Sequence, residues 1–296
     1  MAISSGAPDM ATVLSRARAE ARVTPSTALV DPRALAGKRE RRQFVPRPLQ
    51  RLLGPVLLVA LWQLLSSTGV FNDRTVPPPT RVVQAAVHLI ADGSLQEHLL
   101  TSLLRVGYGA TFGIALGLVL ALVSGLSRVG ENFVDANMEV LRAVPNFALV
   151  PLLIVWFGIS EVPKITLITL AVAVAIYINT FSAIRSVDAG LVEAARSFGV
   201  GRAELIYRVI IPGSLPGFLV GLRLALTASW LSLIFAETIN AKRGLGRMMT
   251  DAREYFQIDV VFVLIGVYAI LGLTSVLIVR FLEGRLLTWR RSYDGD

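Results

Sequence analysis

The stretch Glu193-Ala194-Ala195-Arg196-Ser197-Phe198-Gly199, with the polar run that follows it as far as Ile211-Pro212, decides the fold because it divides a chain of apolar segments. Seven charged residues stand between residues 185 and 217. They are Arg185, Asp188, Glu193, Arg196, Arg202, Glu204 and Arg208. Each such charge would cost about 3 kcal/mol at the centre of a bilayer. We therefore predict that this stretch lies in water between two membrane-spanning helices.

The composition indicates a membrane protein. It has 296 residues, of which 54% are hydrophobic and 17% charged, and its mean hydropathy is +0.62. These values exclude an ordinary soluble domain and indicate an all-α polytopic membrane protein. The net charge of +8 comes largely from arginines beside apolar spans, which is typical of cytoplasmic loops and does not call for a nucleic-acid partner. With no cysteine and two isolated histidines, we expect no metal site and no thiol nucleophile.

Six membrane spans are predicted from the apolar runs. They cover about residues 52–71, 106–126, 133–159, 165–183, 218–239 and 260–281. We expect three parts: a disordered or partly helical cytoplasmic tail over 1–48, a transmembrane domain over 49–287 that contains the loop 185–217, and a short cytoplasmic tail over 288–296. The basic residues of both tails and of the central loop put these segments inside, although the loop after span five is also basic.

Two spans carry polar or small residues in informative positions. The second has small residues every four positions, which predicts a face that packs closely on another helix, with a solute path as the alternative. These residues are Gly109, Gly113, Gly117, Ala121 and Gly125. In the third span, Glu139 and Arg142 are spaced to pair on one helix face. Asn146 either lines the solute path or makes a hydrogen bond between helices.

The central stretch itself is predicted to form two short helices. Asp188 can cap the first and Gly199 can end it, and the second covers about residues 201–210 and stops before Pro212. Four residues of the first helix share one face: Leu191, Ala194, Ala195 and Phe198. This face is consistent with a helix offered to a partner's groove and equally with a hairpin packed on its own bundle.

No motif for ATP binding or hydrolysis is evident. The run from Gly125 to Gly130 begins like a phosphate-binding loop, but Glu131-Asn132 stands where Lys and Ser/Thr are required. We therefore expect this chain to bind no cofactor and to catalyse no reaction.

The spacing of the central stretch resembles the EAA loop of permease subunits of ABC importers. Glu193-Ala194-Ala195, Gly199 and the segment Val209-Ile210-Ile211-Pro212 carry this resemblance, although Val209 and Ile211 stand where the family prefers Ile and Leu. Residues 151–158 (PLLIVWFG) and the pair of segments Ala236–Ile239 and Gly244–Gly246 are similar to the nitrate, sulfonate and taurine branch. The resemblance covers about residues 49–287.

The resemblance implies a type I importer permease fold and a set of partners. These are a second copy of the chain, two cytoplasmic ATPase subunits that hold ATP and Mg, an extracytoplasmic solute-binding protein and the lipid of a bacterial inner membrane. The solute would be a small oxyanion such as sulfonate, taurine, nitrate or bicarbonate, moved inward by alternating access. A secondary transporter that needs no ATPase is the alternative; such proteins usually show internal repeats and charges at mid-membrane, which we do not find here.

The resemblance also implies roles for particular residues. ATPase coupling would fall to Leu191, Glu193, Ala194, Ala195, Phe198, Gly199 and Pro212. The translocation path would include Asn146, Ser229 and Trp230, although Trp230 is equally consistent with packing. Contacts with the binding protein would involve Glu237, Gly244, Gly246 and Arg247, with a structural role at the membrane interface as the alternative for Glu237.

Overall fold

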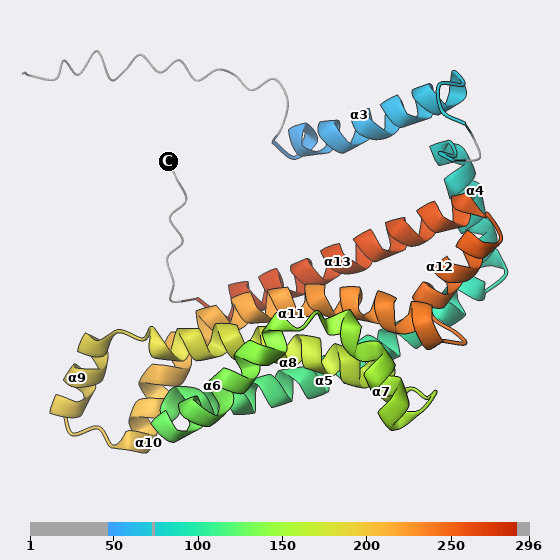
Figure 1. Cartoon of the computed structure of the whole chain (residues 1–296). Coiled ribbons are helices and arrows are strands. Elements are labelled where there is room, and N and C mark those ends of the chain that lie inside the picture. The colour runs from blue at the N-terminus through green and yellow to red at the C-terminus, as the bar shows by residue number, and fades with distance from the viewer. Residues whose placement is uncertain (1–46, 73–74, 289–296) are drawn as a thin grey trace, which may run out of the picture. The chain divides into compact units, whose positions relative to one another are not determined.

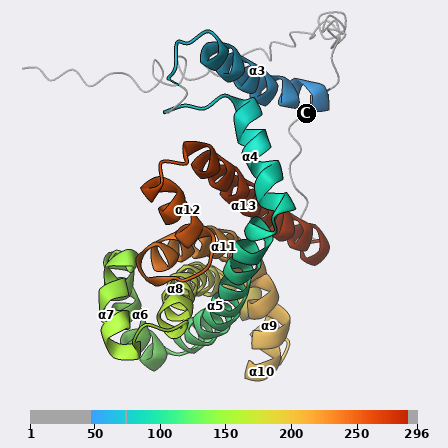
Figure 2. The ribbon, with the colours of Figure 1, turned by 90° about the vertical axis from the view of Figure 1, so that its right-hand side faces the viewer.

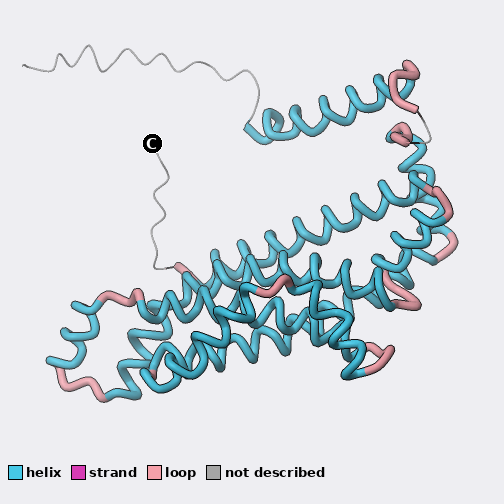
Figure 3. Tube along the Cα trace, viewed as in Figure 1, coloured by secondary structure: helices cyan, strands magenta, loops and turns pink. Residues whose placement is uncertain are grey.

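The structure, a computed structural model, describes residues 47–72 and 75–288. Two compact units divide at residue 56, and of the first only the opening of one helix is described, so the account below concerns the unit 57–296. The predicted tails lie outside the described residues, apart from a few residues at their inner ends. Within the described part every regular element is helical, which agrees with the predicted all-α class (Figure 3).

The helices follow one another through short connections (Figure 1). They are α3 (Arg47–Ser67), α4 (Pro79–Ala91), α5 (Ser94–Leu126), α6 (Arg128–Ala143), η1 (Asn146–Leu149), α7 (Val150–Phe157), α8 (Val162–Arg185), α9 (Ala189–Ser197), α10 (Arg202–Leu205), η2 (Ile206–Ile210), α11 (Ile211–Asn240), α12 (Leu245–Glu254) and α13 (Ile258–Leu286). Among the described residues, α5, α8, α13 and the run from α10 through α11 are each long and apolar enough to cross a membrane. The first predicted span falls on α3, whose described apolar part, residues 53–67, is shorter than a full span.

The third predicted span is not one helix. It consists of α6 followed by η1 and α7, and the two halves meet at 94°. Between them Val144 has extended backbone angles and is followed by Pro145. Proline disfavours helical backbone in the residue before it and donates no backbone hydrogen bond, so the helix ends at Ala143.

The prediction that a helix stops before Pro212 is wrong. The segment η2 is a π-helical turn that leads directly into α11, and Ile210 at the junction has helical backbone angles. A π-helical turn relaxes the regular hydrogen-bond ladder, and a proline in the first turn of a helix removes a donor that would be unpaired there. The fifth predicted span therefore begins inside the polar loop.

The small residues of α5 form the predicted packing face. A Cβ atom added at Gly109, Gly113, Gly117 or Gly125 would lie 2.5 to 2.7 Å from atoms of α8. Ala121, on the same face, has no exposed surface. Gly217 of α11 approaches α8 from another side, where an added Cβ would lie 2.3 Å from the Cβ of Ala183. Helix α8 thus lies at the centre, between α5 and α11, as the view along the bundle shows (Figure 2).

Candidate functional site

The two ends of this bundle carry different kinds of polar segment. Figure 1 shows α9 and α10 at one end and α12 at the opposite end. Below, these are called the α9 end and the α12 end. Each includes several of the residues that the sequence singled out.

At the α9 end, the predicted first helix of the central stretch is α9, and its caps are those predicted. The Asp188 carboxylate accepts a hydrogen bond from the backbone N–H of Gly190 at 2.8 Å. At the other terminus, Gly199 has φ = +80°, and Val200 donates its backbone N–H to the carbonyl of Ala195 at 3.1 Å. This is the Schellman arrangement, in which glycine tolerates the left-handed backbone.

The apolar face of α9 has no partner within the described chain. Leu191 is 59% exposed and Phe198 is 88% exposed, and no residue of α9 is buried. Ala194 is exposed and Ala195 half-buried. The helix contacts chiefly the neighbouring α10. Of the two interpretations of this hairpin, packing on its own bundle does not describe the structure, and the apolar face stands open.

At the α12 end, a charged cluster is buried between helices. Arg105 of α5 is 4% exposed, and its Nη1 donates to the Glu237 carboxylate of α11 at 2.7 Å. Its Nε and Nη2 donate to the two carboxylate oxygens of Glu161, which precedes α8. Lys164 also pairs with Glu161, at 3.2 Å. The Arg105 guanidinium lowers the pKa of Glu161, and two cations balance two carboxylates.

The same cluster holds the loop that precedes α12. Glu237 has no exposed surface, and its carboxylate accepts hydrogen bonds from Ser102 Oγ at 2.8 Å and from the backbone N–H of Gly246 at 2.8 Å. Arg105 Nη1 also donates to the carbonyl of Arg243 at 2.6 Å. Gly244 has φ = +129°, and a Cβ there would lie 2.4 Å from the Glu237 carboxyl. Glu237 and Arg105 therefore hold in place the loop between α11 and α12 and the first turn of α12.

This geometry separates the four residues predicted to contact a binding protein. Glu237, Gly244 and Gly246 are buried, so none of the three is available at the surface to contact another protein in this conformation. Arg247 is half-buried and pairs with Asp251. The alternative considered for Glu237, a structural role, describes its hydrogen bonds here.

The three residues predicted to line a solute path have polar groups that are already engaged inside the subunit. Asn146 Nδ2 donates to Ser232 Oγ at 2.8 Å and to the carbonyl of Leu167 at 3.2 Å, which is the helix-to-helix bond considered as its alternative. Ser229 has no exposed surface. Trp230 donates its indole N–H to Ser275 Oγ at 2.9 Å, so it packs between α11 and α13.

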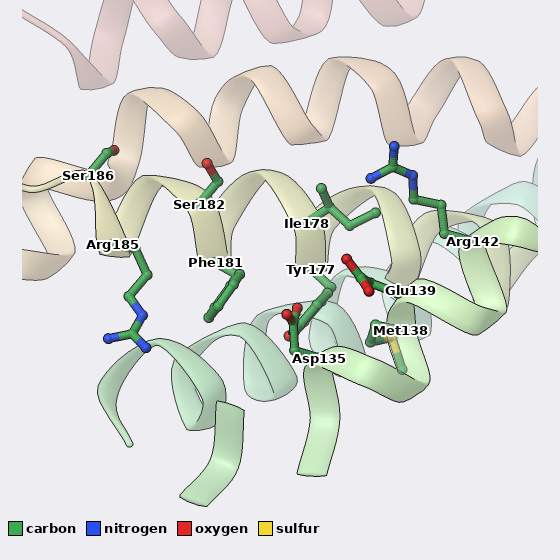
Figure 4. A pocket seen from close by; sticks show the side chains of 10 residues that line it. All are labelled: Asp135, Met138, Glu139, Arg142, Tyr177, Ile178, Phe181, Ser182, Arg185 and Ser186. Carbon is green, nitrogen blue, oxygen red and sulfur yellow. The ribbon is translucent and has the colours of Figure 1, made fainter. Parts of the chain in front are cut away.

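An open cavity of about 470 Å³ lies instead between α6 and α8 (Figure 4). Its lining includes Asp135, Glu139 and Arg142 from α6 and Tyr177 and Arg185 from α8. Tyr177 donates its hydroxyl to Asp135 at 2.9 Å, and Arg185 pairs with Glu131. The predicted pair of Glu139 with Arg142 is not among the ion pairs of the described residues.

Sequence reasoning singled out Glu237 but missed Arg105, Glu161 and Lys164. Arg105 was placed just outside the second span, although it lies four residues before Gly109 and so extends the small-residue face that packs on α8. This four-residue spacing was the sequence signal that Arg105 faces another helix. Glu161 and Lys164 were not singled out, because nothing in the sequence indicates that the turn before α8 meets α5.

Comparison with known proteins identifies the class. The model of the family "Binding-protein-dependent transport system inner membrane component" matches residues 113–288. This is more than half of the chain, which therefore belongs to that family of ABC transporter permeases.

Individual relatives narrow the similarity. The chain is 48% identical over 239 residues to the putative aliphatic sulfonates transport permease protein SsuC of Escherichia coli (strain K12), covering 81% of this chain and 91% of that protein. It is 40% identical to the SsuC protein of Bacillus subtilis (strain 168) over 247 residues, covering 83% and 90%. It is 34% identical to the taurine transport system permease protein TauC of E. coli over 238 residues, covering 79% and 86%.

A solved structure supports the fold. The chain superposes on a chain of an amino acid ABC transporter crystal structure with a TM-score of 0.57 and 20% identity, covering 69% of this chain and 96% of that one. The shared fold is that of an ABC transporter permease.

Proposed function

We propose that this chain is the membrane-spanning permease subunit of an ATP-driven importer that carries aliphatic sulfonates, taurine among them, into the cytoplasm. The solute would arrive on an extracytoplasmic binding protein and pass between two copies of the chain by alternating access. The names of the SsuC and TauC relatives support the solute class. The chain itself performs no chemistry in this scheme.

The observation that carries the proposal is the open face of α9. Leu191 and Phe198 together leave an apolar face of this hairpin exposed, and a face of this kind marks a site of interaction with another protein. Two alanines on that face let a partner's surface approach closely. We assign this face to a cleft in a separate ATPase subunit, with Leu191, Glu193 and Phe198 making the contacts and Gly199 setting the angle of α9.

The orientation of the chain in the membrane follows from this assignment. The ATPase needs cytoplasmic ATP and Mg, so the α9 end is cytoplasmic and the α12 end faces the binding protein. Both termini of the chain then lie in the cytoplasm of a bacterial cell. Closure of the two ATPases would move α9, and the continuous helix from α10 into α11 offers a direct link from the hairpin to the bundle.

Uptake into proteoliposomes tests the proposal. The permease is reconstituted with the ATPase and binding protein from its own transporter. Accumulation of radiolabelled taurine and butanesulfonate is measured with and without ATP enclosed in the proteoliposomes. We expect ATP-dependent accumulation that an ATPase lacking its phosphate-loop lysine abolishes. Accumulation that continues with the inactive ATPase would indicate a secondary transporter and overturn the proposal.

A further inference from the structure

A second cavity adjoins the one between α6 and α8. It has a volume of about 550 Å³ and lies between α8 and α11. The two cavities share Ile178, Ser182 and Ser186, which are spaced four residues apart and therefore lie along one face of α8. Together they form one open trough with α8 as its floor and α6 and α11 as its sides. We call this the α8 trough.

Helix α6 bears three acidic residues at four-residue spacing, Glu131, Asp135 and Glu139, of which Asp135 and Glu139 line the trough. The first two are satisfied by α8: Glu131 pairs with Arg185, and Asp135 accepts from the Tyr177 hydroxyl. The third, Glu139, is exposed and has no ion pair among those of the described residues. The charges facing the trough nearly cancel, so what distinguishes the site is the placement of each charge.

Arg142 is the cation in the trough that lacks a partner within the part of the chain that the structure describes. It is exposed, no ion pair or hydrogen bond engages its guanidinium there, and Figure 4 shows the group directed away from the carboxylates of Asp135 and Glu139. It stands 14 residues, or about 21 Å, from the first residue of α6. Together α6 and the segment 146–157 are apolar enough to form one bent membrane span, and an arginine without an ion pair in such a span calls for water or an anion.

The apolar residues of the lining are suited to the apolar part of a small amphiphilic solute. Met138, Ile178 and Phe181 offer apolar surface in the cavity that Arg142 and Ser182 also line, and Figure 4 shows Ile178 between these two polar residues. Ser182 is exposed on the trough floor, and hydroxyls of this kind donate hydrogen bonds to oxyanions. An aliphatic sulfonate has one tetrahedral anionic head and a short apolar body, which matches this division.

We propose that the α8 trough is a solute-binding site on the translocation route and that Arg142 binds the sulfonate head. The solute class rests on the proposed function, whereas the preference for an anion rests on the trough alone. Arginine presents two parallel N–H groups to an oxyanion, and such charge-assisted bonds are the stronger ones. Glu139, one turn away, repels a second anion and favours solutes that carry an ammonium group as well, such as taurine.

Transport measurements with Arg142→Gln provide the first test. In the reconstituted importer we expect butanesulfonate uptake to fall about ten- to hundredfold, the loss of one charge-assisted contact, while stimulation of the ATPase by the loaded binding protein is retained. Arg142→Lys should restore part of the uptake. Arg128→Gln, which removes an exposed cation from the start of the same helix, is the matched control and should transport normally. Wild-type uptake in Arg142→Gln would overturn the proposal.

The absence of cysteine from the chain allows a second test that needs no transport. In a Ser182→Cys variant of the assembled transporter, the rates of labelling by the anionic sulfonatoethyl and the cationic trimethylammonioethyl methanethiosulfonates are compared. Adding Arg142→Gln should lower the anionic-to-cationic rate ratio by about threefold or more, because a positive charge that lines the same cavity has been removed. Ser67→Cys, exposed at the end of α3, should show no change in its ratio.

The two tests separate the possible failures. If the wild-type importer takes up no sulfonate but the labelling ratio falls as stated, the solute class is wrong and the anion site stands. If sulfonate uptake is normal and Arg142→Gln changes neither uptake nor the labelling ratio, the importer assignment stands and the proposed site is wrong.

Discussion

The α12 end and the α9 end of the same bundle differ in what the chain covers with its own residues. At the α12 end, Arg105 and Glu237 are buried and every charged group of the cluster is met by another part of the chain. At the α9 end, Leu191 and Phe198 are apolar and exposed. A buried charged group whose hydrogen bonds are all made within the chain is not available to bind a partner. An exposed apolar face is available, and burying it against a partner is favourable. The first end should therefore govern stability and the second should govern coupling.

The largest effect on stability is expected at the centre of the cluster. Arg105→Ala removes the cation shared by Glu161 and Glu237 and leaves Glu237 buried with no counter-ion. Breaking a buried pair in this way costs about 3–5 kcal/mol, so we expect a lower thermal midpoint of the detergent-solubilised permease, measured by size-exclusion chromatography after heating.

An exposed ion pair serves as the control for that change. Arg208 pairs with Glu204 across one helical turn at the α9 end, where both side chains are largely in water. Arg208→Ala should shift the midpoint little, because such pairs contribute about 0–1 kcal/mol. Equal shifts for the two variants would remove the stability difference between the two ends.

A smaller loss is expected where α5 meets α8 between the two ends. A Cβ at Gly113 would lie 2.6 Å from Val172 Cβ and 2.7 Å from the carbonyl oxygen of Thr169, so Gly113→Ala must push the helices apart. Overpacking of this kind costs about 1–3 kcal/mol. Gly107, on the same helix, has nothing within 4 Å of an added Cβ. Gly107→Ala should leave the thermal midpoint unchanged or raise it, and a fall like that of Gly113→Ala would count against close packing.

The smallest effect on stability, joined to a large effect on assembly, is expected for Phe198→Ala. At 88% exposure its truncation should change stability by no more than about 0.5 kcal/mol. Affinity for the ATPase should fall at least tenfold, as expected when an anchor that fills a partner's pocket is truncated. Phe256, 85% exposed near α12, gives the matched control. If Phe256→Ala weakens ATPase binding as much, α9 is not the specific contact.

Much of the α9 end could be predicted because its signals are local. Asp188 as a cap, Gly199 as a stop and the register of the apolar face all act within one or two helical turns, and the structure has each of them. The α5 face was predictable for a related reason. Small residues four apart lie on one side of a helix whatever it packs against, although the sequence did not say that the neighbour is α8.

The α12 end could not be predicted in the same way, because its contacts join distant parts of the chain. Arg105 meets Glu161 and Glu237, which are 56 and 132 residues away in sequence. The prolines of the third span indicate that it is not straight, and the structure bends it by 94° after Ala143. The helix through Pro212 was predicted wrongly, because a proline can either end a helix or be accommodated, depending on the backbone before it. Val144 is extended before Pro145, whereas Ile211 is helical before Pro212.

The comparison of Gly199→Val with Gly201→Val tests the central claim, that the hairpin is where the ATPase acts. Both positions have free space around an added Cβ, but Gly199 has φ = +80° and Gly201 has φ = −69°, so only the first substitution strains the backbone. The measurement is the number of sulfonate molecules transported per ATP hydrolysed in proteoliposomes. We predict at least a tenfold fall for Gly199→Val, with a thermal midpoint lowered only by the strain of one residue, about 1–3 kcal/mol, and a normal ratio for Gly201→Val. A normal ratio and normal ATPase association in Gly199→Val would contradict the account.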